Sequence, residues 1–582
     1  MTLTLDMFDH SERSPDVEQA ISRMAGHCEI GRGAIFTRPE VVEAILDLLG
    51  YSSDLPLHNK RLLEPSFGAG DFLLPAAQRL LTAFFREGGT PETAADRLES
   101  AIFAVELHEH TFDETARRLA ELLGRAGLSK QDADLLCSAW LVRDDFLLAR
   151  IEGQFDFVVG NPPYVRQERI PAALLAEYRR RFQTLYDRAD IYIPFFERAL
   201  DLLGAEGALG FICANRWLKN RYGGPLRDKI AKGYWLKYFI NMEGVDAFHS
   251  DVIAYPAITV LQRADATERA TRAVGGSAQA SLPLGKIVEA LLDRTEQGVV
   301  VEEITLGLGG SAPILLDDIR RLTLLRRLER LHPTIEQAGC RVGIGVATGC
   351  DRVYIASMDT LPVEQERKLP LVMARDLVNG KIEWGGKGVL NPFEASGQLA
   401  SLDSYPAFKK YLLSHREAIE GRNVAKRNPD AWYKTIDRIQ PGLLTTPKIL
   451  VPDIKGEGVF VIDEGNYYPH HNLYFITSAE WDLRALLTVL RSSLTLMTVA
   501  TYCTRMSGGF LRFQAQYLRR IRLPRWCDVE ETMRTRLIDA ASSMDQREID
   551  VPVSELYQLS ADEAQRACDI ANAARVGRSA MK

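Results

Sequence analysis

The feature that most constrains the fold is a regular alternation of two patterns between residues 31 and 263. Short apolar runs, among them RLLEPS, AIFAVEL, ADLLCSAWLV, FDFVV and GALGFICAN, alternate with amphipathic stretches such as VVEAILDLLG and FLLPAAQRLLTAFF. Strands that alternate with helices in this way are typical of a parallel sheet covered by helices on both faces. We therefore expect an α/β domain over 31–263, with ligands bound at the carboxyl edge of its sheet.

The rest of the chain follows other patterns. Residues 1–30 are polar and predict a helical extension, and 264–335 predict a Gly/Ala/Ser-rich linker followed by a connecting helix. Residues 336–526 contain shorter β-like runs and turns, which predict a mixed α+β domain, and 527–582 predict a helical tail. No apolar run approaches the ~20 residues of a membrane span, and the acidic N-terminus does not resemble a signal peptide. We expect a cytoplasmic protein with no membrane contact.

Composition excludes several classes of protein. The chain is 46% hydrophobic and 26% charged, which are ordinary globular values and exclude disordered and collagen-like chains. Its eight cysteines include no CxxC pair, which argues against a zinc ribbon or a disulfide framework. The net charge of −7 means that any contact with nucleic acid depends on local basic clusters.

Acidic residues follow several of the predicted strands. Glu64 stands just before the glycine turn PSFGAG, Glu106 ends the next apolar strand, and Asp145 follows a third. Such carboxylates suit a ligand with hydroxyls or a cationic amine, and Glu106 stands where Rossmann-like folds bind ribose hydroxyls. No P-loop lysine follows the last glycine, which disfavours ATP and points to S-adenosylmethionine (AdoMet). The cofactor residues predicted from the turn and the carboxylates are Glu64, Pro65, Gly68, Gly70, Glu106 and Asp145.

The segment FDFVVGNPPYV is the most specific motif in the chain. Its apolar strand delivers Asn161, Pro162, Pro163 and Tyr164 to the same sheet edge. The prolines stiffen the loop and remove two backbone donors. The Asn161 side-chain oxygen and the Pro162 carbonyl can then hold the two N–H groups of a conjugated amino group and direct its lone pair towards a methyl donor. The Tyr164 ring offers a surface on which a planar substrate can stack.

The order GAIFTRPEVV, EPSFGAG, FAVEL, RDDF and NPPY resembles that of the γ-class (Taq-type, Eco57I-like) adenine-N6 DNA methyltransferases of restriction–modification systems. The resemblance implies a Rossmann-like class I AdoMet-dependent methyltransferase domain, followed by a DNA target-recognition domain. It implies that Thr37, Phe146 and Asn161 are further AdoMet-binding residues. It also implies that Asn161 to Tyr164 form the catalytic tetrad and that Phe248 is a second base-stacking aromatic. One departure is GGTPETAADRLES, which looks like an extra segment after the first helix of the domain.

A base inside a duplex cannot reach such a site, so it must be flipped out while another surface holds the DNA. Arginines interleaved with aromatics over 336–526 suit phosphate contacts and base readout, and we expect a basic cleft between the two lobes. The predicted DNA contacts are Arg422, Lys426, Arg427, Arg505, Arg512, Arg519 and Arg520. No Cys, Asp or Glu lies at metal-site spacing from His470-His471, so no metal site is expected.

These patterns predict an enzyme that transfers the AdoMet methyl to N6 of a flipped adenine at a specific site in double-stranded DNA. A monomer would suffice, and a separate restriction endonuclease acting on the same site is a partner that the resemblance allows. The alternatives left open are methylation of cytosine N4, of ribosomal-RNA guanine N2 or of a protein glutamine amide, and a catalytically inactive DNA-binding defence protein.

Overall fold

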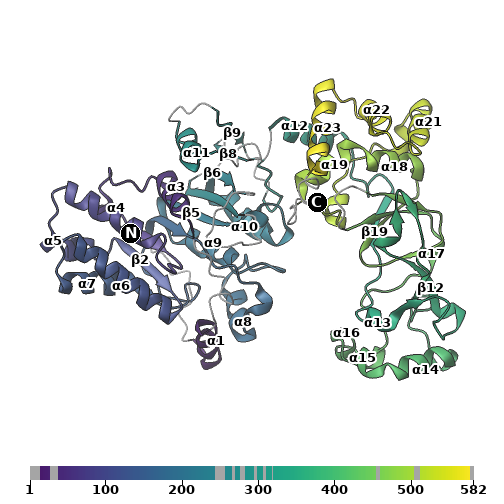
Figure 1. Ribbon diagram of the computed structural model, residues 1–582, viewed down its shortest axis with the longest axis horizontal. Helices are drawn as coiled ribbons and strands as arrows, with labels where there is room; N and C mark the ends of the chain where they lie inside the picture. Colours follow the sequence, from purple (N-terminus) through teal and green to yellow (C-terminus); the bar gives the residue numbers. More distant parts are fainter. Residues whose placement is uncertain are drawn as a thin grey trace. The chain divides into compact units, whose positions relative to one another are not determined.

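The structure is a computed structural model that describes residues 13–26, 37–242, 256–264, 269–275, 282–293, 298–305, 310–316, 319–453, 459–503 and 511–576. The chain divides into two compact units, residues 1–319 and 320–582. Figure 1 shows a broad α/β arrangement in the first unit, and small sheets with a group of helices in the second.

A nine-stranded sheet forms the centre of the first unit, with strand order β3-β2-β1-β4-β5-β7-β6-β8-β9. The strands β3, β2, β1, β4 and β5 pair in parallel, and β7 runs antiparallel to both β5 and β6. The strands are β1 (Leu62–Glu64), β2 (Ile102–Glu106), β3 (Leu141–Arg143), β4 (Phe155–Gly160), β5 (Leu203–Ala214), β6 (Tyr234–Asn241), β7 (Pro256–Arg263), β8 (Ala270–Val274) and β9 (Glu302–Thr305).

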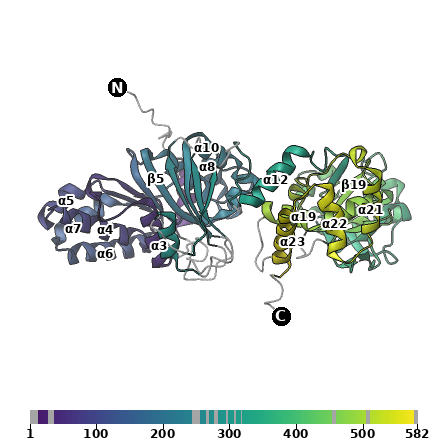
Figure 2. The same ribbon diagram turned by 90° about the horizontal axis from the view of Figure 1, so that it is seen from above.

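Helices cover both faces of this sheet, as the alternation predicts. Figure 2 shows α3 on one side of the sheet and α8 and α10 on the other. The helices are α1 (Pro15–Ala25), α3 (Pro39–Leu49), α4 (Leu73–Arg86), α5 (Pro91–Leu98), α6 (Glu109–Arg125), α7 (Lys130–Trp140), α8 (Ala172–Arg181), α9 (Tyr192–Asp201), α10 (Gly224–Gly233) and α11 (Leu284–Leu291). The segment GGTPETAADRLES, which the family resemblance leaves unmatched, contains α5.

The strand order places a ligand crevice between β1 and β4. Leu63 of β1 pairs with Phe103 of β2 on one side and with Val158 of β4 on the other, so the chain winds outwards in both directions from this pair. In open α/β sheets, such a switch point leaves a crevice at the carboxyl ends of the strands, because the two connections leave in opposite directions. The glycine turn follows β1 and the NPPY loop follows β4, so both motifs meet at this crevice.

Two predictions about the first unit differ from the structure. The run ADLLCSAWLV was predicted as a strand, but most of it lies in α7 and only its end forms β3. A short apolar run without clear period fits a buried helix as well as a buried strand. The linker and connecting helix predicted for 264–335 contain β8, α11 and β9, of which β8 and β9 extend the sheet. Small and polar residues are tolerated at this edge.

The second unit combines small sheets with helices, in agreement with the predicted α+β class. Two four-stranded sheets have the orders β10-β19-β16-β17 and β11-β15-β12-β18, and β13 pairs with β14. The strands are β10 (Cys340–Ile344), β11 (Ile355–Ser357), β12 (Lys368–Val372), β13 (Leu377–Val378), β14 (Lys381–Ile382), β15 (Lys387–Leu390), β16 (Lys448–Pro452), β17 (Val461–Asp463), β18 (Tyr468–Pro469) and β19 (Leu473–Ser478).

Helices α18 and α19 pack against α21 and α23, so the helical tail predicted for 527–582 is part of a larger helical group. The helices of this unit are α12 (Ile319–Leu331), α13 (Asp351–Tyr354), α14 (Pro406–Ser414), α15 (Arg416–Glu420), α16 (Asn423–Lys426), α17 (Gly442–Thr445), α18 (Leu483–Arg491), α19 (Ser493–Tyr502), α20 (Ala515–Leu518), α21 (Glu531–Ala540), α22 (Gln546–Leu556) and α23 (Ala561–Val576).

Within the described part of the chain, no single helix has the length and apolar character to cross a membrane, and only the bent pair α18 and α19 passes that test jointly.

Candidate functional site

The turn after β1 is built on two glycines in the left-handed region. Gly68 has φ +51° and Gly70 has φ +83°, conformations that side chains with a Cβ rarely adopt. A Cβ on Gly70 would also lie 2.8 Å from Cγ2 of Thr115, so a side chain has no room there. A Cβ on Gly68 would meet nothing within 4 Å. The turn therefore keeps open space beside its backbone, which is what the close approach of a ligand needs.

The carboxylate of Glu106 is fixed by two backbone donors. The N–H of Gly68 donates to Oε2 at 2.9 Å, and the N–H of His108 donates to Oε1 at 2.8 Å. Glu106 is 6% exposed and closes β2 at the carboxyl edge of the sheet. A carboxylate offers about four lone-pair positions, so each oxygen retains the capacity to accept from a ligand hydroxyl.

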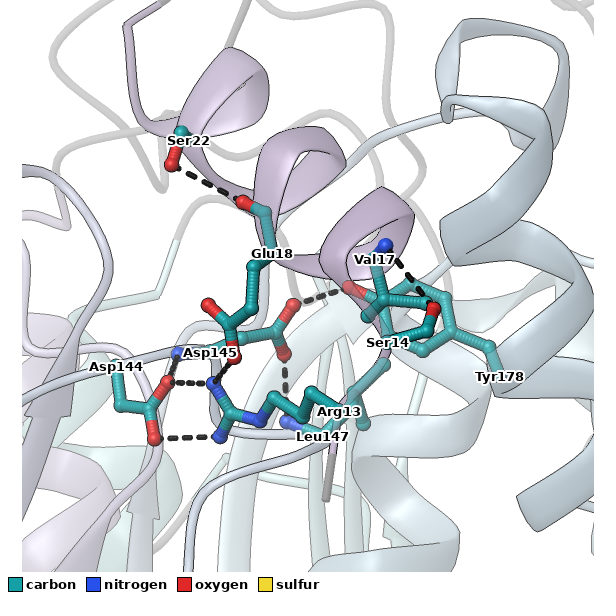
Figure 3. Close-up of polar contacts among 9 residues, drawn as sticks. All are labelled: Arg13, Ser14, Val17, Glu18, Ser22, Asp144, Asp145, Leu147 and Tyr178. Carbon is teal, nitrogen blue, oxygen red and sulfur yellow. Dashed lines mark hydrogen bonds and ion pairs between the residues drawn. The ribbon is translucent and has the colours of Figure 1, made fainter.

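Two further carboxylates, those of Asp144 and Asp145, lie at the end of β3. Oδ1 of Asp144 accepts from the N–H of Asp145 at 2.7 Å, and Oδ1 of Asp145 accepts from the N–H of Leu147 at 2.8 Å. The Tyr178 hydroxyl of α8 donates to Oδ2 of Asp145 (Figure 3). Burial raises the pKa of Asp145, and the two donors partly offset that effect. The ring of Phe146 packs against Phe195 with centroids 5.0 Å apart.

The loop after β4 brings the predicted tetrad to the same place. Nδ2 of Asn161 donates to the Thr37 hydroxyl at 3.2 Å, which fixes the amide plane, and its backbone carbonyl accepts from Ser66 at 3.4 Å. Oδ1 of Asn161 is the acceptor end of that amide. Pro162 is buried, and the half-buried ring of Tyr164 lies 6.3 Å from the ring of Tyr192.

These segments enclose a cavity of about 480 Å³, within the usual range of small-molecule sites. Its wall includes most of the predicted cofactor residues, namely Thr37, Glu64, Pro65, Gly68, Glu106, Asp145, Phe146 and Asn161. Gly70 shapes the turn without lining the cavity. Pro163 also lines it, whereas Pro162 and Tyr164 do not. Phe248 lies outside the described residues.

The cavity is acidic at its centre. Glu64 is 1% exposed, and its Oε2 has no hydrogen-bond partner among the described residues. Burial, with the neighbouring charges of Asp71 and Glu106, raises the pKa of Glu64 well above its ordinary range. A buried carboxyl in this situation favours a ligand with a positive charge or a hydrogen-bond donor. The carboxylates and the aromatic ring at this cavity therefore fit a ligand with vicinal hydroxyls, a planar ring and a cationic group.

Comparison with known proteins shows the family to which this chain belongs. Residues 96–248 match the model of the Eco57I restriction-modification methylases, and residues 390–523 match that of the TaqI-like C-terminal specificity domain. The chain is 54% identical to the Type II methyltransferase M.PaeR7I of Pseudomonas aeruginosa, over 91% of this chain and 92% of that protein. The chain belongs to the Type II methyltransferase family. The predicted family resemblance is confirmed.

One further relative of this Type II methyltransferase agrees with that assignment, and one solved structure agrees with the fold. M.XhoI of Xanthomonas vasicola is 53% identical over 92% of this chain and 98% of its own length. The fold is similar to that of the Type IIL restriction-modification enzyme MmeI, solved in complex with DNA. That similarity has a TM-score of 0.57 at 11% identity and covers 91% of this chain and 77% of the MmeI chain. The predicted fold class is confirmed.

The specificity-domain match overlaps the segment predicted to contact DNA, but one predicted contact needs correction. Arg422 is 8% exposed, and its guanidinium donates to the carbonyls of Ile419, Thr348 and Trp432. It holds three parts of the second unit together, so it is not placed to contact a phosphate. Trp432 is likewise part of a hydrophobic core. A basic cluster in the sequence does not reveal which of its members face inwards.

The remaining basic residues of that prediction have different surroundings. Lys426 and Arg427 are exposed at the end of α16, and Arg519 is exposed and pairs with Glu336 at 2.9 Å. Arg512 pairs with Asp453, and Arg520 lies over the ring of Tyr502 at 4.5 Å. Arg505 lies outside the described residues. The predicted DNA contacts other than Arg422 stay predictions.

A carboxylate distant in sequence joins the two histidines considered for metal binding. Oδ2 of Asp351 lies 3.3 Å from Nε2 of His470, and the rings of His470 and His471 have centroids 4.0 Å apart. One ligand atom from each of these residues lies within 4.8 Å of the other two. Asp351 cannot be found from local spacing, because the Val346–His470 bridge brings it close to the two histidines only in the folded chain. The prediction of no metal site stays a prediction.

Sequence reasoning missed several residues around the cofactor cavity. Arg13 binds Asp144, Asp71 accepts from the N–H of Thr37 at 2.7 Å, and Tyr178 binds Asp145. The segment RDDF gave a sequence signal for Asp144, and the glycine turn gave one for Asp71. Nothing local marked Arg13 or Tyr178, because each acts on a residue far away in the sequence.

Proposed function

We propose that this Type II methyltransferase is a site-specific DNA methyltransferase that transfers the methyl group of AdoMet to N6 of an adenine flipped out of double-stranded DNA. The observation that carries the proposal is the placement of Asn161. Its amide nitrogen is held by Thr37 at the wall of the acidic cavity, so the catalytic loop and the cofactor residues share one space.

The cavity wall supports AdoMet as the cofactor. Glu106 would accept from the two ribose hydroxyls, and Asp145 with Phe146 would hold the adenine ring by a hydrogen bond and a face contact. The buried carboxyl of Glu64 would face the positively charged methionine end. When bound, AdoMet supplies an electrophilic methyl group on a sulfonium. Because AdoMet supplies the electrophile, this chain would only have to bind and orient the two reactants and place charges around them.

The NPPY loop supports an amino group as the methyl acceptor. Oδ1 of Asn161 and the carbonyl of Pro162 would accept from the two N–H groups of the target, and Tyr164 would stack on its ring. Holding both N–H groups turns the nitrogen lone pair towards the methyl group. The amino nitrogen would then bond to the methyl group that AdoMet supplies, S-adenosylhomocysteine would be the leaving group, and the nitrogen would release one proton to solvent.

The second unit supports DNA as the substrate, because it matches a specificity domain and because the MmeI relative was solved in complex with DNA. Lys426, Arg427 and Arg519 are the exposed members of the predicted contact set. As the modification enzyme of a restriction–modification system it would act on nucleoid DNA in the cytoplasm, and a separate nuclease with the same site would be its counterpart.

Long-read sequencing that detects modified bases tests the proposal. Genomic DNA would come from a methylation-deficient host that expresses either the wild type or the Asn161→Ala variant. We expect N6-methyladenine in one short motif with the wild type and no mark with the variant. A mark on cytosine would replace the proposed base. No DNA mark from soluble, AdoMet-binding protein would contradict DNA as the substrate and favour RNA or a protein amide.

The raised pKa of Glu64 predicts that cofactor affinity depends on pH. A positively charged ligand favours the carboxylate, so binding lowers this pKa and releases a proton. The affinity for AdoMet should therefore fall as the pH drops through the raised pKa of Glu64, by up to about tenfold per pH unit.

Isothermal titration across the neutral pH range checks this dependence, with Glu64→Gln as the matched control. The amino group of AdoMet titrates in the same way with both proteins, so the difference between them isolates Glu64. Parallel pH profiles for the wild type and the variant would show that Glu64 does not face the charged end of the cofactor.

A further inference from the structure

Helix α1 reaches the cavity at its carboxyl end, although it precedes every motif of the cofactor site. Met24 forms part of the cavity wall. The carbonyl of Ala25 lies 2.9 Å from Nδ1 of His108, and the backbone N–H of His108 holds the Glu106 carboxylate. The carboxyl end of α1 is thus linked through His108 to the Glu106 carboxylate, the group that would bind the ribose.

The other end of α1 is attached to the end of the neighbouring strand in the same site, where the backbone N–H of Asp144 donates to the Glu106 carbonyl at 3.2 Å. The guanidinium of Arg13 donates to both oxygens of Asp144, from Nη1 at 2.7 Å and from Nη2 at 2.6 Å (Figure 3). Such a two-point pair fixes the orientation of the carboxylate as well as its position. Oδ1 of Asp144 also accepts from the N–H of Asp145, so Arg13 completes the network that sets the Asp145 backbone.

The body of α1 is suited to hold these two ends in place. Ser14 caps its first turn by accepting from the N–H of Val17, so the helix begins directly after Arg13. Val17, Ala20 and Ile21 form one buried stripe, and α1 packs against α8. Helix α8 carries Tyr178, whose hydroxyl donates to Asp145. Both α1 and its packing partner therefore act on the Asp144–Asp145 turn.

We propose that α1 is a clasp across the cofactor pocket and that Arg13 is the positioning residue that fastens it. The inference deepens the proposed function and rests on it. With Arg13 in place, the Asp144–Asp145 turn and Met24 hold the bound cofactor from two sides, and the cofactor leaves only when the Arg13–Asp144 pair opens. Arg13 touches no reacting atom, so its effect falls on cofactor release and not on methyl transfer.

The test measures AdoMet release from the full chain by stopped-flow displacement with excess S-adenosylhomocysteine. We expect Arg13→Ala to release AdoMet about tenfold faster, since charge-assisted pairs of this kind contribute effects of about that size. The KM for AdoMet should rise by a similar factor, and the single-turnover rate at saturating AdoMet should stay within about twofold of wild type. Arg13→Lys keeps the charge without the two-point geometry, so it should fall between the two.

Arg86→Ala is the control, because Arg86 of α4 forms an exposed ion pair with Asp54, with Nη1 and Oδ1 2.7 Å apart, and neither residue lines the cavity. It should release AdoMet at the wild-type rate. In the double variant Arg13→Ala/Asp144→Asn, AdoMet release should be no faster than in the faster of the two single variants, and release rates that simply multiply would show that the two residues do not act as a pair.

The outcomes separate this inference from the proposed function. A wild type that does not bind AdoMet overturns both. A wild type that binds AdoMet, with Arg13→Ala and Arg13→Lys releasing it at the wild-type rate, overturns the clasp alone. A loss of single-turnover rate at saturating AdoMet, with release unchanged, would also overturn it. If Arg13→Ala fails to fold, the rate of AdoMet release from Arg13→Lys tests the clasp instead.

Discussion

Replacing Asn161 by alanine is expected to abolish methyl transfer while leaving the cofactor bound. The variant loses Oδ1, one of the two acceptors proposed to hold the target amino group, and keeps the Pro162 carbonyl. Removal of one preorganised group that stabilises a transition state typically lowers kcat by about 10²–10³-fold. Single-turnover transfer of a radiolabelled methyl group to DNA carrying the site measures this loss, and titration of AdoMet measures binding.

Thr37→Val separates the presence of the acceptor from its orientation. Valine has nearly the shape of threonine but removes the hydroxyl that accepts from Nδ2 of Asn161 at 3.2 Å. Both acceptors for the target remain, but the amide plane of Asn161 is no longer fixed. We expect a smaller loss than for the alanine variant, about tenfold, because misorientation weakens a hydrogen bond without removing it.

Three results would contradict this account. An Asn161→Ala rate within a few fold of wild type would remove the asparagine from the chemical step. A loss of AdoMet affinity as large as the loss of rate would make cofactor binding, and not the chemical step, the main role of Asn161. Thr37→Val as slow as Asn161→Ala would show that the hydroxyl itself has a role in transfer.

The sequence anticipates that the predicted cofactor segments meet at one sheet edge, because each of these segments is local. A strand that ends in Glu106, a turn that needs Gly68 and Gly70, and the NPPY loop are each contained in a few neighbouring residues. Strand order then brings them together without further information, since parallel strands share one carboxyl edge. The meeting of these segments in one cavity is therefore the part of the structure that sequence reasoning could anticipate.

The parts that escaped prediction depend on distant contacts. Arg13 and Asp144 are 131 residues apart, and neither residue marks the other. Arg422 resembles its exposed neighbours Lys426 and Arg427 in sequence, but its contact with the Thr348 carbonyl fixes it inside the second unit. Strands β8 and β9, the last two strands at one end of the sheet, are also hard to detect, because a short strand with small or polar residues lacks a strong periodic signal.

Glu106 offers the largest expected effect on cofactor binding. Glu106→Ala would remove the two charge-assisted hydrogen bonds proposed for the ribose, each expected to contribute about 1.5–3 kcal/mol. It also leaves the N–H groups of Gly68 and His108 without the carboxylate that they hold at 2.9 and 2.8 Å. We expect the Kd for AdoMet to rise at least about 100-fold, measured by isothermal titration, while transfer at saturating AdoMet falls much less.

Two comparison variants make the Glu106 result specific. Glu106→Gln keeps the size of the side chain but turns an NH₂ group towards one of the two backbone donors, so it should bind nearly as poorly as the alanine variant. Glu109→Ala removes a nearby carboxylate whose side chain is 74% exposed and pairs with Arg143, and it should bind AdoMet as the wild type does. Wild-type affinity in Glu106→Ala would exclude this carboxylate from the ribose site, because a buried acceptor that binds two hydroxyls cannot be lost without cost.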